Sequence, residues 1–158
     1  MGALFGFLSL FIVVIVLDQG TKLVVLQSMQ PGEIRPVIDG VFNLTLAFNR
    51  GVAFGLFSDF PDGVRHLLLG VTALAALGAV GYFFFRDYAG DMVGRGALVL
   101  VLGGACGNII DRVRLGVVVD FLDFYLGQNH WPAFNVADSA ICVGVFILLF
   151  RRPQPPAQ

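Results

Sequence analysis

Four aspartates near the carboxyl end of the chain stand out, because they lie within or between two apolar segments: Asp111, Asp120, Asp123 and Asp138. Carboxylates at the mouth of an apolar segment are costly, so each of them needs a partner or a function. Two carboxylates held close together share one proton, because their like charges oppose a second ionisation. Such a pair supplies both a general base and a general acid, which is enough to hydrolyse a peptide bond.

Asp120 and Asp138 are the first candidates for this pair. The ionised member would deprotonate a water molecule, and the protonated member would polarise the carbonyl and protonate the departing amine. A plainer interpretation is equally open from spacing alone, in which Asp138 caps the helix that follows and Asp120 is a solvated loop residue. Asp111 competes with Asp120 for its role, and the residues by themselves do not separate the two.

Further polar residues share helical spacing around these aspartates. Asn108 lies three residues before Asp111 and four before Arg112, so the three side chains share a helix face. They form either a structural cluster that closes the helix or a site in which Arg112 binds a phosphate, a carboxylate or a carbonyl. Asp18 and Lys22 are also four residues apart with the acid first, and we interpret them as a structural ion pair that lines the site.

Other catalytic chemistries have weaker support. Asn49, in the motif FNRGVAFG, is either a turn residue or a hydrogen-bond donor to an extended peptide. A serine–lysine pair from Ser28 and Lys22 is conceivable, but no GxSxG motif is present. The two histidines, His66 and His130, are too far apart for a histidine-based metal site. We therefore expect neither a metal nor another cofactor.

Composition indicates an integral membrane protein. The chain has 158 residues, of which 57% are hydrophobic and only 13% are charged, whereas a soluble domain carries about 25% charged residues. This length favours one domain, residues 1–152, with a Pro-rich disordered tail at 153–158. The net charge of −1 and the lack of a basic patch argue against a nucleic-acid partner. Cys106 and Cys142 both lie in apolar runs and are interpreted as packing residues.

Four apolar segments are predicted to be membrane-spanning helices, at about 3–26, 66–85, 93–110 and 134–150. A bilayer core of ~30 Å needs ~20 helical residues, so the last two are short. The first segment lacks a basic start and a small-residue cleavage site, which favours a membrane helix over a cleaved signal peptide. The glycines and alanines of the third segment would let neighbouring backbones approach closely, which predicts a central position in the bundle.

The connections carry strand signals. Residues 33–57 are rich in β-branched and aromatic residues and contain turn residues at 39–40 and 49–51, which predicts two to four short strands. The stretch VVVDFLDFY at 117–125 is too short to span a membrane and suits a strand or a short helix at the interface.

The order of the segments brings the polar residues to one surface. An even number of spans places both termini on one side and both long connections on the other. The ends of the helices that carry Asp18, Lys22, Asp111 and Asp138 then meet at the same interface. This convergence is the strongest residue-level argument for a site. The distribution of basic residues leaves the orientation open, because arginines are denser near the termini but basic residues are more numerous on the loop side.

The sequence resembles the lipoprotein signal peptidase family, the type II signal peptidases of bacteria. Four motifs carry the resemblance, in the family's order and spacing: LDQGTK at 17–22, FNRGVAFG at 48–55, GGACGNIIDRVRLGVVVDF at 103–121 and FNVADSAI at 134–141. The resemblance implies a mainly α-helical membrane protein with four transmembrane helices and a small extracytoplasmic β-sheet cradle between helices 1 and 2. It implies an aspartic endopeptidase that removes signal peptides from prolipoproteins, cutting before a diacylglyceryl-modified cysteine.

The resemblance also implies residue roles and surroundings. The catalytic pair would be Asp120 and Asp138. The substrate-binding residues would be Asn49, Gly51, Asn108, Arg112 and Asn135. The supporting residues would be Asp18, Lys22 and Asp111. The implied setting is the bacterial inner membrane with both termini cytoplasmic and the active site near the extracytoplasmic face, and we expect a monomer whose partners are prolipoproteins, membrane lipids and globomycin-type cyclic depsipeptide inhibitors.

Two other function classes compete with this interpretation. A proton-coupled carrier would use intramembrane acids, but the halves of the chain show no repeat and the acids gather at one surface rather than at mid-membrane. A catalytically silent protein on the same scaffold would bind the lipidated precursor and never cleave it. Both aspartates of the implied pair are present, which argues against this second class.

Overall fold

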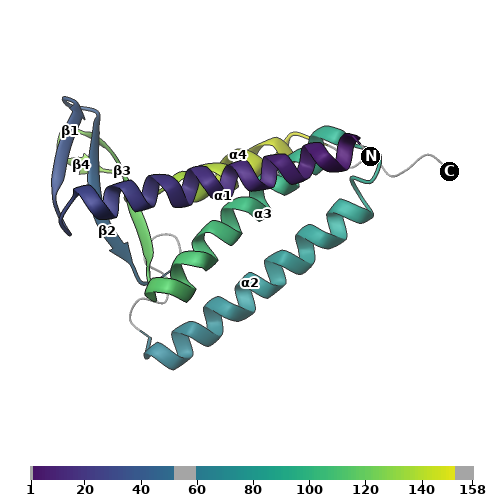
Figure 1. Ribbon diagram of the computed structural model, residues 1–158, viewed down its shortest axis with the longest axis horizontal. Helices are drawn as coiled ribbons and strands as arrows, with labels where there is room; N and C mark the ends of the chain where they lie inside the picture. Colours follow the sequence, from purple (N-terminus) through teal and green to yellow (C-terminus); the bar gives the residue numbers. More distant parts are fainter. Residues whose placement is uncertain (1, 52–59, 152–158) are drawn as a thin grey trace.

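The computed structural model describes residues 2–51 and 60–151. The described chain forms helices α1 (Gly2–Ser28), α2 (Asp62–Phe85), α3 (Met92–Leu115) and α4 (Val136–Leu149), and strands β1 (Ile34–Ile38), β2 (Phe42–Asn49), β3 (Val118–Leu126) and β4 (Asn129–His130). Helix α3 packs against α1 and α4 and is inclined to both, α2 lies on the other side of α3, and the sheet lies at the end of the bundle away from the amino terminus (Figure 1). The protein is thus mainly helical with one small sheet.

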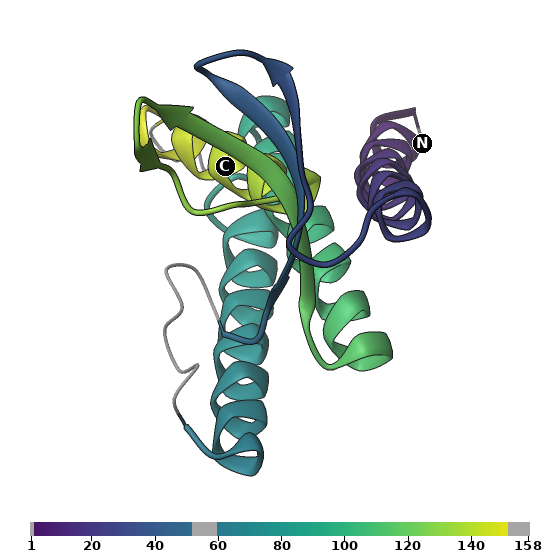
Figure 2. The same cartoon turned by 90° about the vertical axis from the view of Figure 1, so that its left-hand side faces the viewer.

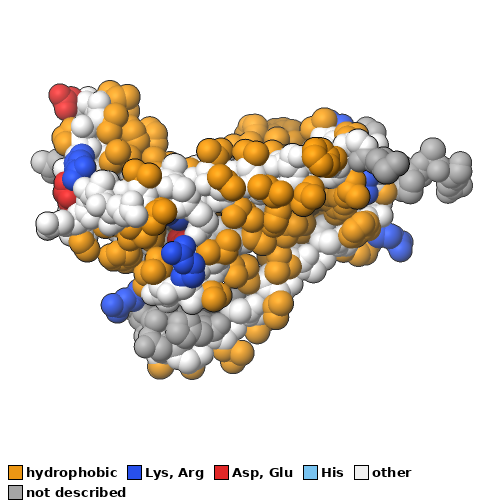
Figure 3. Space-filling view, viewed as in Figure 1, with side chains coloured by type: hydrophobic (Ala, Val, Ile, Leu, Met, Phe, Trp, Pro, Cys, Tyr) orange, Lys and Arg blue, Asp and Glu red, His pale blue; other side chains and the backbone are white. Residues whose placement is uncertain are grey.

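Each of the four predicted apolar segments forms a helix. By length and composition, α1 and α3 are long and apolar enough to cross a membrane, and the apolar parts of the other two described helices, Gly70–Phe85 and Val136–Leu149, are shorter. Along α1, Leu8, Val16 and Val24 are 53%, 62% and 63% exposed. Apolar side chains cover most of the helical length on the face seen in Figure 3. Outward-facing apolar residues of this kind suit contact with lipid.

The third helix continues past its predicted end at residue 110 and includes Asp111 and Arg112. Two basic residues, Arg112 and Arg114, occupy its last turn, where they interact favourably with the negative end of the helix dipole. Gly116 then ends the helix with a left-handed φ of 74°, a conformation that glycine adopts without steric cost. The polar cluster around Asn108 is therefore carried on a rigid helix.

The sheet combines both long connections, in the order β1-β2-β3-β4. The expected sheet between the first two helices is present as β1 and β2, but it is larger than expected, because β2 pairs antiparallel with β3, which lies between α3 and α4. Figure 2 shows these two parts of the chain side by side. A strand around Asp120 is confirmed, and the β region predicted at 33–57 ends at Asn49, with residues 52–57 outside the described chain. This pairing places Ala47 opposite Asp120.

Two glycines let α3 lie close to its neighbours. A Cβ atom on Gly104 would lie 2.3 Å from the carbonyl oxygen of Ala137, and one on Gly107 would lie 2.5 Å from a carboxylate oxygen of Asp18. Neither position can carry a larger side chain without a shift of backbone or of Asp18. The predicted close approach at the third helix is thus confirmed, and it brings α1 and α4 together at the level of the polar residues.

The sheet is fixed to the end of α1 by a small apolar core. Val25 of the helix and Met29, directly after it, pack with Leu46, Val119 and Phe121 of the strands, and all five are buried. Because Val119 and Phe121 flank Asp120 in sequence, this core anchors the strand that carries the candidate aspartate.

Candidate active site

A cavity of about 1610 Å³ opens between α2, α3, α4 and the sheet. Asp120 and Asp138 both line it, at the end where the strands meet the helices. Apolar residues of α2, among them Ala73, Leu74 and Leu77, form the opposite wall. A concave apolar site with a few convergent polar groups is the usual form of a ligand-binding cavity.

Asp120 is held in the cavity wall by two amides. Asn49 donates to its Oδ2 atom at 3.1 Å, and Asn135 donates to its Oδ1 atom at 2.7 Å. The side chain is only 3% exposed, so the interpretation of Asp120 as a solvated loop residue is wrong. Burial, and secondly the negative charge of Asp138, raise the pKa of Asp120 to about 7. A carboxyl with such a pKa can hold a proton near neutral pH.

Asp138 lies in the first turn of α4, where it both caps the helix and lines the cavity. The side chain of Asn135 accepts a hydrogen bond from the Asp138 amide at 2.9 Å, and Asp138 accepts one from the Asn135 amide at 3.3 Å. Asn108 donates to the Oδ1 atom of Asp138 at 2.8 Å. The cap expected from the sequence is therefore present, and it orients Asp138 as well as starting the helix.

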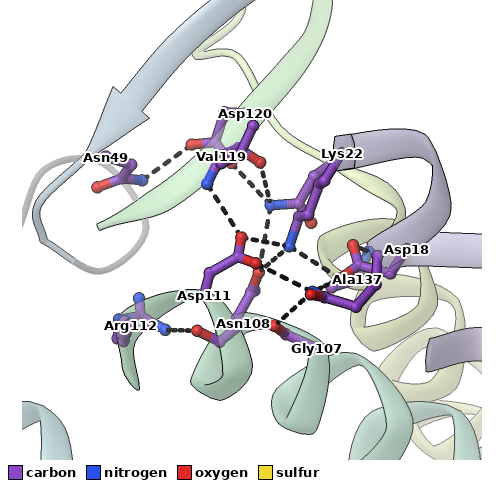
Figure 4. Close-up of polar contacts among 12 residues, drawn as sticks. Asp18, Lys22, Asn49, Gly107, Asn108, Asp111, Arg112, Val119, Asp120 and Ala137 are labelled. Atoms are coloured by element: carbon purple, nitrogen blue, oxygen red, sulfur yellow. Dashed lines mark hydrogen bonds and ion pairs between the residues drawn. The ribbon is translucent and has the colours of Figure 1, made fainter. Parts of the chain in front are cut away.

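Lys22 lies at the centre of a buried ion cluster with Asp18 and Asp111, which we call the Lys22 cluster. The Nζ atom is 2.9 Å from a carboxylate oxygen of each aspartate, and it donates to Asn108 at 3.1 Å. The side chains of Lys22, Asp18 and Asp111 are 2%, 0% and 2% exposed. Figure 4 shows Lys22 between the two carboxylates. The predicted Asp18–Lys22 ion pair is confirmed, and Asp111 completes it.

The two carboxylates of the Lys22 cluster hold the backbone next to the candidate pair. Asp18 accepts from the amide of Ala137 at 2.9 Å, directly before Asp138. Asp111 accepts from the amide of Val119 at 3.1 Å, directly before Asp120. Asp111 is bound to Lys22 and does not line the cavity. The geometry therefore favours Asp120 over Asp111 as the partner of Asp138.

Asn108 and Asn135 connect the Lys22 cluster to both candidate aspartates. Asn135 donates to the Oδ1 atom of Asn108 at 3.2 Å, and Lys22 donates to the same atom. With its oxygen used in this way, Asn108 turns its amide nitrogen towards Asp138. Asn135 also donates to the carbonyl oxygen of Val119 at 3.2 Å. The two asparagines thus fix where the carboxylates of the pair point.

Arg112, Asn49 and Gly51 meet at the cavity wall. Arg112 donates to the carbonyl oxygen of Gly51 at 3.0 Å, and the Gly51 amide donates to Asn49 at 2.9 Å. Asn49 is therefore a turn residue that also donates to Asp120, and its role as a donor to an extended peptide stays a prediction. The buried Nε atom of Arg112 has no hydrogen-bond partner within the described chain. This guanidinium retains donor capacity for a carbonyl group of a bound peptide.

The fourth aspartate, Asp123, belongs to a separate cluster in the sheet. Asn43 donates to it at 2.9 Å, and His130 lies 2.8 Å from it. Although burial opposes ionisation, these hydrogen bonds hold the pKa of Asp123 below its ordinary value. The serine–lysine alternative has no geometric support, because Lys22 is enclosed by its carboxylates whereas Ser28 is exposed.

Gln19 is a polar residue of the site that the sequence did not indicate. Its side chain bonds to Asp18, Asp111 and the Gly107 carbonyl oxygen. It stands in the motif LDQGTK, but residues one apart on a helix do not share a face, so helical spacing gave no reason to join it to Asp18.

Comparisons with known proteins agree with this geometry. The family model described as signal peptidase (SPase) II matches residues 10–152. The lipoprotein signal peptidase of Geobacter sulfurreducens is 47% identical over 134 residues, covering 85% of this chain and 82% of that protein. The lipoprotein signal peptidase of Ralstonia nicotianae is 46% identical over 142 residues, covering 90% of this chain and 80% of that protein.

Solved structures show the same fold. Two structures, each described as a bacterial membrane enzyme, superpose with TM-scores of 0.82 and 0.80 at 32% identity, and both cover 91% of this chain. The superposition covers 85% of the first of these structures and 90% of the second. The match to the family model and the identity to these relatives, each over most of the chain, show that this chain belongs to the signal peptidase II family and is a membrane peptidase.

Proposed function

We propose that this peptidase cleaves with Asp120 and Asp138 as an aspartic pair, on the amino side of a diacylglyceryl-modified cysteine. Removal of signal peptides from prolipoproteins follows from the family and from relatives that are lipoprotein signal peptidases. The observation that carries the aspartic mechanism is that both carboxylates line one cavity and both accept hydrogen bonds from Asn135, that of Asp120 from the Asn135 side chain and that of Asp138 from the Asn135 backbone amide.

The surroundings of the two carboxylates suggest how they divide the work. Asp138 lies at the amino end of α4, where the helix dipole favours a negative charge. Asp120 lies in a strand, and its pKa of about 7 keeps the proton there near neutral pH. Asp138 is therefore the base of the free enzyme, and Asp120 is the acid.

The reaction then needs no other group. Asp138 takes a proton from water as the water oxygen attacks the scissile carbonyl carbon. Asp120 polarises the carbonyl oxygen, and its proton passes to the amine as the carbon–nitrogen bond breaks. One proton remains on Asp138 and returns to Asp120, which restores the pair. Acid–base catalysis of this kind supplies about 10²- to 10⁴-fold in rate, and positioning supplies much of the rest.

The substrate is held by the polar end of the cavity and its apolar wall. Asn49, Gly51, Asn108, Arg112 and Asn135 surround the extended peptide. The signal helix and the acyl chains lie between α2 and α3, where Ala105 and Ile109 face the cavity. The glycines of α3 do not form this surface, because Gly104 and Gly107 pack against α4 and α1. A cyclic depsipeptide inhibitor of the globomycin type would occupy the same cavity.

The proposed membrane arrangement is based on the difference between the two ends of the bundle. All four helices would span the bacterial inner membrane, with both termini cytoplasmic and the sheet at the extracytoplasmic face. The support for this arrangement is that the sheet and the candidate site lie at one end, away from the amino terminus (Figure 1). The protein would act as a monomer among membrane lipids.

A cleavage assay tests the proposed function directly. Purified protein in detergent is given a diacylglyceryl-modified precursor with a chelator present, and the products are separated on a gel and weighed by mass spectrometry. We expect one cut before the modified cysteine and no cut in the unmodified precursor. Binding without any cleavage would favour the silent binder, and proton-coupled flux in vesicles without cleavage would favour the carrier.

The pKa of Asp120 predicts the pH dependence of cleavage. The free enzyme loses the proton on Asp120 as pH rises through about 7, so kcat/KM is expected to fall by about tenfold per pH unit above that value. The measurement is kcat/KM from pH 5 to 9 on a precursor without titratable groups near the cut.

Thermal unfolding over the same range is the control for this prediction. A raised pKa in the folded state makes stability decline as pH rises between the unfolded value of about 4 and the folded value of about 7. Above pH 8 this contribution is constant. A fall in kcat/KM between pH 8 and 9 at constant stability therefore reports the pair, and a flat profile there would contradict the role of Asp120 as the acid.

A further inference from the structure

We propose that Gln19 is a positioning residue for the catalytic pair. Its side-chain amide fixes the carboxylates of Asp18 and Asp111, which in turn hold the backbone directly before Asp138 and Asp120. The inference rests on the proposed function of that pair. It adds a residue that has no hydrogen bond to the pair itself among the described residues and that acts through the Lys22 cluster.

The contacts of Gln19 bridge α1 and α3. Its Nε2 atom lies 2.9 Å from Oδ1 of Asp111, 3.1 Å from Oδ2 of Asp18 and 3.1 Å from the carbonyl oxygen of Gly107. Its Oε1 atom accepts from Arg114 at 3.2 Å. Because Arg114 can only donate, it fixes which end of the amide is the oxygen and turns the nitrogen towards the carboxylates.

Gln19 donates to the carboxylate oxygen of Asp111 that Lys22 and the Val119 amide do not contact. The Oδ2 atom of Asp111 receives Lys22 and the Val119 amide. Within the described chain, the Oδ1 atom receives Gln19 alone. Because Asp111 is 2% exposed, water cannot readily replace this donor. A buried carboxylate oxygen without a donor is unfavourable, so the carboxylate would rotate or take up a proton.

Movement of Asp111 would shift the backbone directly before Asp120. Asp111 holds the Val119 amide, and the next residue along the strand is Asp120. A misplacement of about 1 Å in a reacting group costs on the order of 100-fold in rate. The position of Gln19 therefore bears on the rate of cleavage more than on the affinity for the precursor.

The charge around Gln19 explains why a neutral donor is needed. The charged groups that contact it or lie beside it are Asp18 and Lys22 on α1 and Asp111 and Arg114 on α3. The buried cluster has two carboxylates and one ammonium group. A third carboxylate facing both aspartates would be repelled unless it carried a proton.

The first test is Gln19→Leu, which keeps the volume and removes the amide. We expect kcat for the diacylglyceryl-modified precursor to fall by about 10- to 100-fold, while KM changes by less than threefold. Thr21→Ala is the matched control, since Thr21 bonds only to carbonyl groups of its own helix, and it should cleave within twofold of wild type. A Gln19→Leu protein with unchanged kcat would overturn the proposal.

The second test separates positioning from a structural role through pH. In Gln19→Glu the new carboxyl repels Asp18 and Asp111 when ionised, but donates its O–H group when protonated. We expect the rate of Gln19→Glu relative to Gln19→Leu, measured at the same pH, to rise at least fivefold between pH 8 and pH 5.5. A ratio that does not change with pH would overturn the proposal even if both variants fold poorly.

Failure of this inference is distinguishable from failure of the proposed function. If Asp120 and Asp138 are not the pair, at least one of their asparagine variants still cleaves, whatever the effect of Gln19→Leu. If the pair is right and Gln19 is not a positioning residue, those variants are inactive while Gln19→Leu retains the wild-type kcat.

Discussion

Asp138→Asn and Asp120→Asn should each bind the diacylglyceryl-modified precursor with an affinity within threefold of wild type and cleave it about 10²- to 10⁴-fold more slowly. Each substitution removes an acid–base group that supplies about 10²- to 10⁴-fold in rate, and the size of the side chain is retained. The measurement is single-turnover cleavage together with precursor binding in detergent.

Asp120→Asn and Asp111→Asn are expected to differ in their effect on stability. Burial and the charge of Asp138 raise the pKa of Asp120 to about 7, so its ionised form disfavours the folded state at pH 8. Asp120→Asn removes that charge, and its melting temperature at pH 8 should equal or exceed that of wild type. Asp111→Asn should instead lose both cleavage and stability, because Asp111 is ion-paired with buried Lys22.

Asp123→Asn is the matched control for this experiment. Asp123 is a buried aspartate of the same strand, but it bonds to Asn43 and His130 and lies outside the cavity lining. It should cleave within a few-fold of wild type. An inactive but folded Asp111→Asn beside an active Asp120→Asn would assign the pair to Asp111 and Asp138 instead.

Lys22→Met should give the largest loss of stability among substitutions at the site. Lys22 is 2% exposed and pairs with two carboxylates that are 0% and 2% exposed. Removing one partner of a buried ion pair costs about 3–5 kcal/mol, because a charge is left without compensation. We expect a large drop in the melting temperature in detergent and loss of cleavage at every pH tested.

A second substitution and a surface control sharpen this prediction. Adding Asp18→Asn to Lys22→Met removes one of the stranded charges and should recover part of the melting temperature without restoring cleavage, because Asn108 still lacks its donor from Lys22. Arg35→Met breaks an ion pair with Glu33 that is 48% and 32% exposed. Exposed pairs contribute about 0–1 kcal/mol, so its melting temperature should stay near that of wild type, and an equally small effect of Lys22→Met would contradict the buried cluster.

The helices and the gathering of polar residues at one surface could be predicted from the sequence. Apolar segments long enough for a helix are a local signal, and their even number alone placed both long connections at the same end. Helical spacing likewise put Asn108, Asp111 and Arg112 together and paired Asp18 with Lys22. Gly116 ends α3 and Asn135 caps the start of α4, positions that these residue types favour, although the apolar pattern by itself predicts that α3 ends at residue 110.

The preference for Asp120 over Asp111 as the candidate partner of Asp138, and the composition of the sheet, came from the tertiary structure. Asp111 and Asp120 are alike in sequence, and they differ because α1 brings Lys22 to Asp111 whereas the pairing of β2 with β3 turns Asp120 into the cavity. Gln19 becomes part of the site only because Gly107 lets α3 lie against α1. Such contacts join residues about 90 positions apart, and no local periodicity records them.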